Sequence, residues 1–112
     1  MLYSVRAKYI PEKLEEFHGK LKDGSIKNQK PDGEEICESM VRARVTQPGI
    51  VQWTETCYCS PPLKHERQTV YDRYFTDITT TEIDEPTEFE GASFMGMMEQ
   101  EARSALLKDE AQ

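Results

Sequence analysis

Apolar and polar residues alternate over the first ten positions of the chain. The apolar members of this alternation are Tyr3, Val5, Ala7 and Tyr9. A period of two places them on one side of an extended segment, which is typical of a β-strand with one buried face. The sequence therefore predicts a strand at the start of the chain.

The period becomes helical after Pro11, a residue suited to the first turn of a helix. Leu14, Phe17 and Leu21 follow at spacings of three and four, and Gly24 can end this helix as a C-cap. Turn-forming residues occupy 28–33. Beyond them a second apolar stripe predicts a short helix that closes before a strand at about 41–46. The residues of that stripe are Ile36, Cys37, Met40 and Val41.

Two strand-like segments flank Pro48-Gly49, which predicts a β-hairpin. A two-residue turn would place Arg42 opposite Glu55, and a three-residue loop would pair odd positions with odd. We predict the second register, because it makes the apolar faces coincide and because type II turns splay hairpin strands. A slip of one residue would turn the whole face over. The apolar face of the first strand contains Val41, Ala43 and Val45, and that of the second contains Val51, Trp53, Glu55, Cys57 and Cys59.

Residues 63–75 fit either a helix that starts after Pro62 or an alternating strand. The β-branched segment 76–83 predicts a strand. Five carboxylates between 82 and 90 mark residues 84–91 as an acidic linker to a C-terminal helix at about 92–107. The apolar stripe of that helix contains Phe94, Met98, Ala102 and Ala105.

With residues 63–75 helical, the elements follow the order β-α-(short α)-β-β-α-β and end in a further helix. This is the split βαβ, ferredoxin-like order. We therefore predict a single α+β domain over residues 1–112, with a ferredoxin-like antiparallel sheet, helices on one face and a C-terminal helix. The chain length suits one domain with one core.

The opening segment 1–17 runs from a strand through Pro11 into an acidic amphipathic helix. In this it resembles the start of the dimeric α+β-barrel proteins, which include small monooxygenases, isomerases and stress proteins. The resemblance implies the fold and a homodimer, and it carries no functional residue. The surplus apolar residues at 94–106 also favour a homodimer.

Composition and charge narrow the possible partners. An apolar content of 37% is too high for a disordered chain. Since no apolar run is long enough to span a bilayer and no signal-peptide pattern opens the chain, we expect a cytoplasmic protein that does not bind membranes. The net charge of −7 falls entirely in residues 61–112, so nucleic acid is not an expected partner.

Side chains that could act as nucleophiles, acids or bases, or metal ligands are concentrated in residues 57–67, on either side of Pro61-Pro62. Cys59 could act as a nucleophile with His65 as its base, oriented by Glu66 or Asp72. The alternative is that the two thiols are small core residues and that residues 65–67 form an exposed helix start.

A metal site could draw on Cys37, Cys57, Cys59 and His65. The Cys-x-Cys spacing argues against it, because a strand separates such thiols by two rises of about 3.3 Å each. The same spacing disfavours a disulfide between Cys57 and Cys59. We therefore expect no metal and no cofactor.

Glu55 is expected among the apolar residues of its strand face. Burial raises the pKa of a carboxyl group, so Glu55 could serve as a general base. The predicted catalytic residues are then Glu55, Cys59 and His65, and the predicted ligand-binding residues are Trp53, Cys57, Arg67 and Tyr71. These residues favour a small-molecule-binding protein or a cofactor-independent enzyme. The alternatives are an interaction module that uses the Met-rich C-terminal helix, and a metal-binding or redox-active thiol module.

Overall fold

The computed structural model describes residues 1–110 and contains a five-stranded antiparallel sheet in the order β4-β1-β3-β2-β5. The α+β class and the antiparallel sheet predicted from the sequence are confirmed. Among the described residues, no helix has both the length and the apolar character needed to cross a bilayer. The strands are β1 (Leu2–Tyr9), β2 (Arg44–Gln47), β3 (Ile50–Thr56), β4 (Phe75–Ile83) and β5 (Ala92–Ser93).

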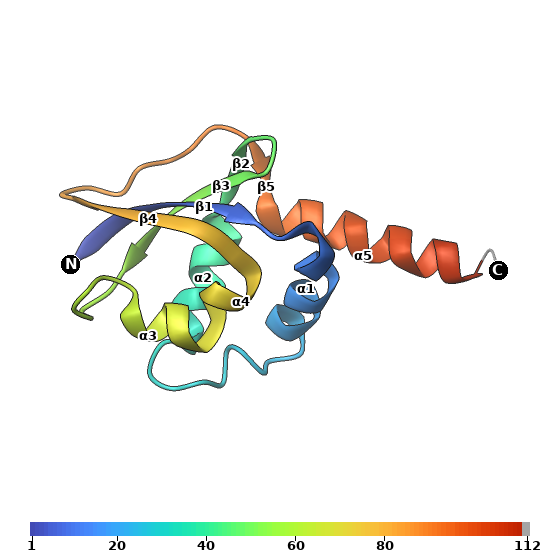
Figure 1. Ribbon diagram of the computed structural model, residues 1–112, viewed down its shortest axis with the longest axis horizontal. Coiled ribbons are helices and arrows are strands. Elements are labelled where there is room, and N and C mark those ends of the chain that lie inside the picture. Colours follow the sequence, from blue (N-terminus) through green and yellow to red (C-terminus); the bar gives the residue numbers. More distant parts are fainter. Residues whose placement is uncertain (111–112) are drawn as a thin grey trace.

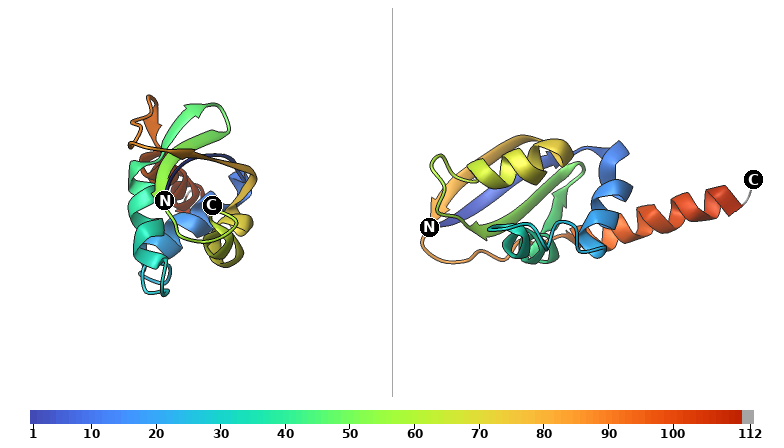
Figure 2. Two further views of the ribbon diagram at one scale, coloured as in Figure 1. Left: turned by 90° about the vertical axis from the view of Figure 1, so that its left-hand side faces the viewer. Right: turned by 90° about the horizontal axis from the view of Figure 1, so that it is seen from below.

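Helices cover one face of this sheet, and the last helix leads away from it (Figure 1). The views from the end and from below show the same two-layer arrangement (Figure 2). The segment Lys64–Tyr74, for which the sequence allowed helix or strand, is helical throughout and includes a π-helical turn. The helical elements are η1 (Pro11–Lys13), α1 (Leu14–Lys22), α2 (Gly33–Arg42), α3 (Lys64–Glu66), η2 (Arg67–Tyr71), α4 (Asp72–Tyr74) and α5 (Phe94–Glu110).

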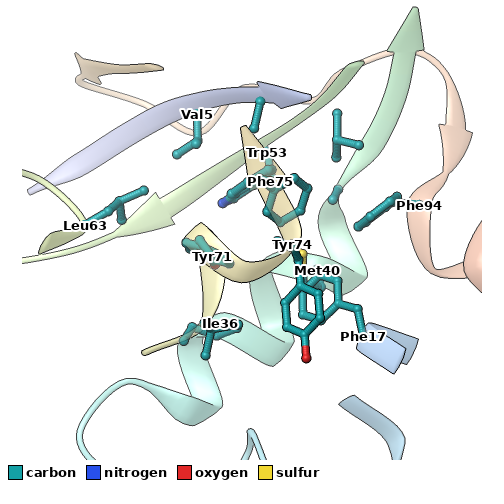
Figure 3. Close-up of a cluster of buried hydrophobic side chains, with 14 of the residues drawn as sticks. Val5, Phe17, Ile36, Met40, Trp53, Leu63, Tyr71, Tyr74, Phe75 and Phe94 are labelled. Atoms are coloured by element: carbon teal, nitrogen blue, oxygen red, sulfur yellow. The ribbon is translucent and has the colours of Figure 1, made fainter. Parts of the chain in front are cut away.

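An aromatic cluster joins the sheet to the helices (Figure 3). Phe75 lies at its centre, with its ring centroid 5.2 Å from that of Trp53 and 5.8 Å from those of Phe17, Tyr71 and Phe94. Such rings bury large areas and prefer tilted or edge contacts. The cluster therefore fixes the positions of Trp53 and Tyr71, which donate hydrogen bonds to Glu55.

The β2–β3 hairpin has the predicted register. Val45 pairs with Val51 and Arg44 with Gln52, so odd positions face odd positions. The turn itself differs from the predicted three-residue loop, because Gln47 already pairs with Ile50 and an irregularity follows between Val45 and Gln47. The extra residue at this β-bulge restores the register that buries the apolar face.

The predicted strand at about 41–46 begins too early. Helix α2 continues through Arg42, and β2 starts only at Arg44. Val41 is consequently 64% exposed on the helix instead of lying on the apolar face of a strand. The helical period of Ile36 and Met40, both fully buried, determines the structure here.

Residues 84–91, the predicted acidic linker, connect β4 to β5 without helix or strand. The C-terminal helix begins at Phe94, two residues later than predicted, because Ala92 and Ser93 pair with Val45 and Arg44 of β2. Phe94 and Met98 are fully buried against the body, whereas Leu106 is 61% exposed. The first turns of α5 therefore anchor it, and its later turns project away (Figure 2).

Candidate functional site

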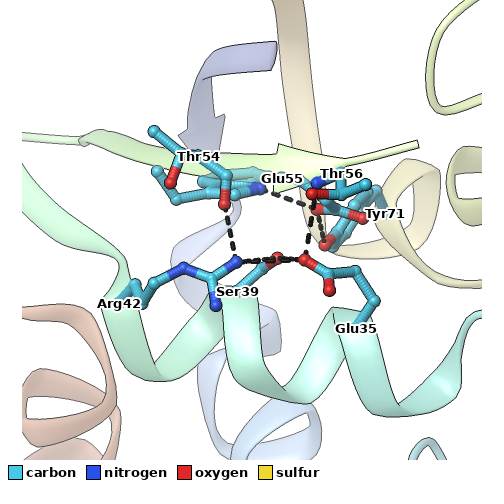
Figure 4. A network of polar contacts seen from close by, with 8 residues as sticks. Glu35, Ser39, Arg42, Thr54, Glu55, Thr56 and Tyr71 are labelled. Atoms are coloured by element: carbon cyan, nitrogen blue, oxygen red, sulfur yellow. Dashed lines mark hydrogen bonds and ion pairs between the residues drawn. The ribbon is translucent and has the colours of Figure 1, made fainter. Parts of the chain in front are cut away.

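Helix α2 takes the place of a neighbouring strand along the last residues of β3 (Figure 4). Arg42 donates a hydrogen bond to the Thr54 carbonyl oxygen at 2.9 Å, and Glu35 accepts one from the Thr56 backbone N–H at 3.4 Å. Glu35 and Arg42 also form an ion pair at 3.0 Å. These side chains satisfy strand groups that β2 does not reach, and they hold α2 beside the end of β3.

Glu55 lies behind this contact in a sealed position. Its side chain is fully buried, and its Oε1 accepts hydrogen bonds from Trp53 Nε1 at 2.8 Å and from the Tyr71 hydroxyl at 2.5 Å. Oε2 is buried without a hydrogen-bond partner among the described residues. Burial raises the pKa of Glu55 to about 8, assisted by the charges of Glu66 and Glu35 and opposed by the two hydrogen bonds. Glu55 is therefore a neutral acid at neutral pH.

Glu55 faces the interior, as the strand register predicted, and it is not paired with Arg42. Arg42 bonds Glu35 and the Thr54 carbonyl group, and neither of these contacts involves Glu55. Tyr71, predicted as a ligand-binding residue, is fully buried, and its hydroxyl is used by Glu55. Trp53 is fully buried as well. The three residues form one closed cluster inside the core.

The chain turns immediately after β3, which ends at Thr56. The backbone N–H of Cys59 donates to the Cys57 sulfur at 3.2 Å, so the segment folds back on itself. The prediction that both cysteines continue the strand is wrong. The geometric argument that separated their sulfur atoms therefore does not apply, and the ligand atoms of Cys57, Cys59 and Glu66 all lie within 4.8 Å of one another.

Glu66 reaches this corner from the start of the helical segment. The helix is entered through Leu63, whose φ of 62° is unusual for a branched side chain and which is fully buried. Glu66 is only 2% exposed, so the predicted exposed helix start is wrong at this residue. The Cys59 thiol donates to Glu66 at 3.4 Å. Burial, with the Glu66 contact as the next cause, raises the pKa of Cys57 to about 12.

The predicted pairing of Cys59 with His65 is not formed. His65 Nδ1 contacts the carboxylate of Asp32, on the loop before α2, and the Cys59 thiol turns to Glu66. Asp32, His65 and Glu66 nevertheless form a second set whose ligand atoms lie within 4.8 Å of one another. Glu66 belongs to both sets and so connects the thiols to the His65–Asp32 pair.

An open cleft of about 460 Å³ gives access to this corner. The Tyr58 side chain is 86% exposed and forms part of the wall of this cleft. Three carboxyl groups and two thiols line the cleft, and no described lysine or arginine does. The lining residues are Pro31, Asp32, Glu35, Thr56, Cys57, Tyr58, Cys59 and Glu66.

Arg67 does not join this site. It forms an ion pair with Asp72 at 2.9 Å and lines a separate cleft with Pro61, Pro62 and residues of β4. Its position follows from helical geometry, because Arg67 is adjacent to the buried Glu66 and lies about 100° around the helix from it. Arg67 and Cys57, both predicted as ligand-binding residues, therefore line different clefts.

Sequence reasoning did not place three carboxyl groups in one cleft, and it named Glu66 only as a residue that could orient His65. Glu66 carried a signal, since it lies three positions after Leu63 and four before Val70, on the stripe of buried residues. Glu35 carried a weaker one, as it adjoins the buried Ile36. Asp32 carried none, because its contact with His65 spans 33 positions of the chain.

Comparisons of the chain with protein-family models, with curated proteins and with solved structures found no match.

Proposed function

We propose that the cleft beside Cys57 and Cys59 binds a small ligand that carries a positive charge. The observation that carries the proposal is Glu66, a carboxyl group 2% exposed that forms none of the ion pairs among the described side chains. Buried carboxylates are normally paired with a cation, because removing a charge from water costs several kcal/mol or more. A bound cation would supply the missing partner.

The other two carboxyl groups of the cleft already have partners. Glu35 pairs with Arg42, and Asp32 contacts His65. They therefore add polar acceptors to the walls, and Glu66 is the carboxyl group of the cleft that has no cationic side chain paired to it among the described residues. A cation entering the cleft would meet Glu66 at the inner end and these acceptors nearer the surface.

Tyr58 supports an organic cation in particular. It is the most exposed large apolar side chain of the described residues, and it lies on the wall of an acidic cleft. The face of a phenol ring attracts an ammonium group by about 0.5–1 kcal/mol at exposed sites. The cleft volume of about 460 Å³ falls in the range typical of small-molecule sites.

The proposal is for binding, and catalysis by Glu55 is not part of it. Glu55 is fully buried and does not line the cleft, so a substrate in the cleft would not touch it. A cofactor-independent reaction would have to use Cys59, Glu66 or the His65–Asp32 pair instead.

A titration with matched ligands tests the proposal. Benzylamine and benzoate, added to metal-free protein and followed by amide NMR shifts, differ mainly in charge. We expect benzylamine to move resonances of residues 56–66 and benzoate to leave them unchanged. Glu66→Gln should weaken the response, whereas Glu38→Gln, at an exposed position of α2, should preserve it. Equal responses to both compounds, or shifts elsewhere only, would remove the proposal.

We also propose the ferredoxin-like topology for this chain. The order β4-β1-β3-β2 of the first four strands supports it, as do the two helical crossovers, formed by α1 and α2 and by residues 64–74. Both crossovers lie on the same face of the sheet (Figure 1). Strand β5 and helix α5 would be additions to that core.

A second candidate function is an interaction module that uses α5, with a homodimer as its simplest form. The exposed Leu106 and Leu107, at 61% and 65%, on the projecting part of the helix favour it. Light scattering of the chain and of a Leu106→Ser, Leu107→Ser variant tests it. We expect a dimer mass that falls to the monomer mass in the variant, and a monomer at every concentration would exclude it.

A further inference from the structure

We infer that Cys57, Cys59 and Glu66 form a binding site for a thiophilic divalent metal ion, with Zn²⁺ as the best match. The site lies at the inner end of the cleft. It goes beyond the proposed function, because metal binding needs no organic ligand. The sequence argued against a metal at this position on the basis of spacing, and the turn after β3 removes that argument.

The donor set suits zinc by chemistry. Two sulfur atoms select soft or borderline ions over Mg²⁺ and Ca²⁺, which prefer oxygen. Tetrahedral zinc accepts thiolates, imidazoles and carboxylates, with bonds of about 2.0–2.3 Å. The ligand atoms of such a site are roughly 3.3–3.8 Å apart. Those of Cys57, Cys59 and Glu66 already lie within 4.8 Å of one another, so a small contraction would complete the arrangement.

The backbone brings these donors together before any metal binds. Cys57 and Cys59 are held by the hydrogen bond from the Cys59 N–H to the Cys57 sulfur at 3.2 Å, and the Cys57 N–H is held by the Met1 carbonyl group at 2.9 Å. Glu66 is fixed by the buried Leu63 that precedes its helix. A preformed site of this kind loses little conformational entropy on binding.

The charges around the site favour a cation. Glu66 is buried beside two thiols with no cationic side chain paired to it among the described residues. A divalent ion would compensate the carboxylate and displace the thiol protons, as metal binding to cysteine does. The two protons released would pass to solvent through the cleft.

His65 is the candidate for the fourth ligand. It adjoins Glu66, and one of its ring nitrogens contacts the carboxylate of Asp32. Metal-binding histidines commonly have a carboxylate hydrogen-bonded to the other ring nitrogen, which orients the ring. With His65 bound the site would be closed, and without it the fourth position would face the cleft.

Cobalt(II) titration of the full chain, reduced and metal-free, tests the inference. We expect one tetrahedral Co²⁺ per chain with a thiolate-to-cobalt charge-transfer band, which Zn²⁺ displaces. Cys57→Ser and Cys59→Ser should each lose most of the band. Cys37→Ser should keep it, because Cys37 lies on α2 and does not belong to this group of ligand atoms. His65→Ala should weaken binding if the ring is a ligand. A missing band, or one that survives both cleft substitutions, would overturn the inference.

Thiol protection provides a test without any substitution. The wild-type chain is alkylated with iodoacetamide with and without Zn²⁺, and each cysteine is followed by mass spectrometry. We expect Zn²⁺ to protect Cys57 and Cys59 and to leave the rate at Cys37 unchanged. Equal rates with and without Zn²⁺ would contradict the site. Since benzylamine binding is measured on metal-free protein, failure here leaves the proposed function standing.

Discussion

Two buried carboxyl groups, Glu55 and Glu66, lie in the same corner of the molecule but differ in their hydrogen-bond partners and in their access to solvent. Glu55 is 0% exposed and receives two neutral hydrogen bonds inside an aromatic core. Glu66 is 2% exposed, adjoins two thiols and lines an open cleft. Both are buried polar groups in a small protein. Access to solvent, more than burial, therefore distinguishes a candidate site from a core feature.

The largest expected effect concerns the proton on Glu55. Its pKa is raised from 4.5 to about 8, so between these pH values the folded chain keeps a proton that the unfolded chain has released. The free energy of unfolding should therefore fall as pH rises, by about 1.4 kcal/mol per pH unit and by roughly 5 kcal/mol across the window. Below pH 4.5 the contribution is fully retained.

Urea unfolding from pH 4.5 to 8 measures this dependence, and Glu55→Gln is the matched control. Glutamine keeps the acceptor for Trp53 and Tyr71 and does not titrate, so most of the slope should vanish in the variant. An identical slope in the variant would show that the proton is bound elsewhere.

Trp53 and Tyr58 sharpen the comparison between the sealed cluster and the open cleft. Trp53→Ala should lower the free energy of unfolding by about 3–5 kcal/mol, because it leaves a cavity where a fully buried ring packs against Tyr71 and Phe75. Tyr58→Ala should change it by no more than about 0.5 kcal/mol, since Tyr58 is 86% exposed. Denaturant unfolding of both variants is the measurement. A large loss at Tyr58 would mean that this ring stabilises the fold instead of lining a site.

Tyr71→Phe tests how the sealed carboxyl group is supported. The substitution removes the hydroxyl that bonds Glu55 Oε1 at 2.5 Å and leaves the ring in place. We expect a loss of about 1–2 kcal/mol at neutral pH, the usual result of depriving a buried group of one partner. The aliphatic and aromatic packing should be unchanged, which the near-UV circular dichroism spectrum would verify. No loss would indicate that Trp53 alone satisfies Glu55.

The smallest expected effect is at the contact between α2 and the end of β3. Glu35→Gln removes the ion pair with Arg42. The Glu35 side chain is 30% exposed and the Arg42 side chain is 44% exposed. Pairs of this exposure contribute about 0.2–1 kcal/mol, with the larger values at low salt. Glu38→Gln, on an exposed position of the same helix, is the control and should be silent. An equal change in the two variants would remove the role given to this contact.

Local patterns predicted the parts of the fold that depend on one element and its nearest neighbour. The alternation of Val5 and Ala7 gave β1, and the matching of apolar faces gave the register of Val45 against Val51. The predicted start of the strand after α2 was too early. Val41 extends the apolar pattern of that strand, although it lies exposed on the helix.

The site was predictable only in part, for a related reason. Glu55 could be placed inside because strand alternation fixes its face, and the cysteines stood out by their chemistry. The approach of Glu66 and Asp32 to the thiols depends on contacts between segments far apart in the sequence, such as that of Asp32 with His65. Sequence spacing carries no information on such long-range contacts, so the thiols were wrongly kept on a strand.

The most direct test of the difference between the two carboxyl groups is the effect of Zn²⁺ on thermal unfolding in matched variants. The melting temperature of the reduced chain is measured with and without Zn²⁺ for wild type, Glu55→Gln and Glu66→Gln. A ligand that binds only the folded state raises the melting temperature. We predict that Glu55→Gln keeps the wild-type increase and that Glu66→Gln loses most of it. An equal increase in both variants, or its loss in both, would contradict the account.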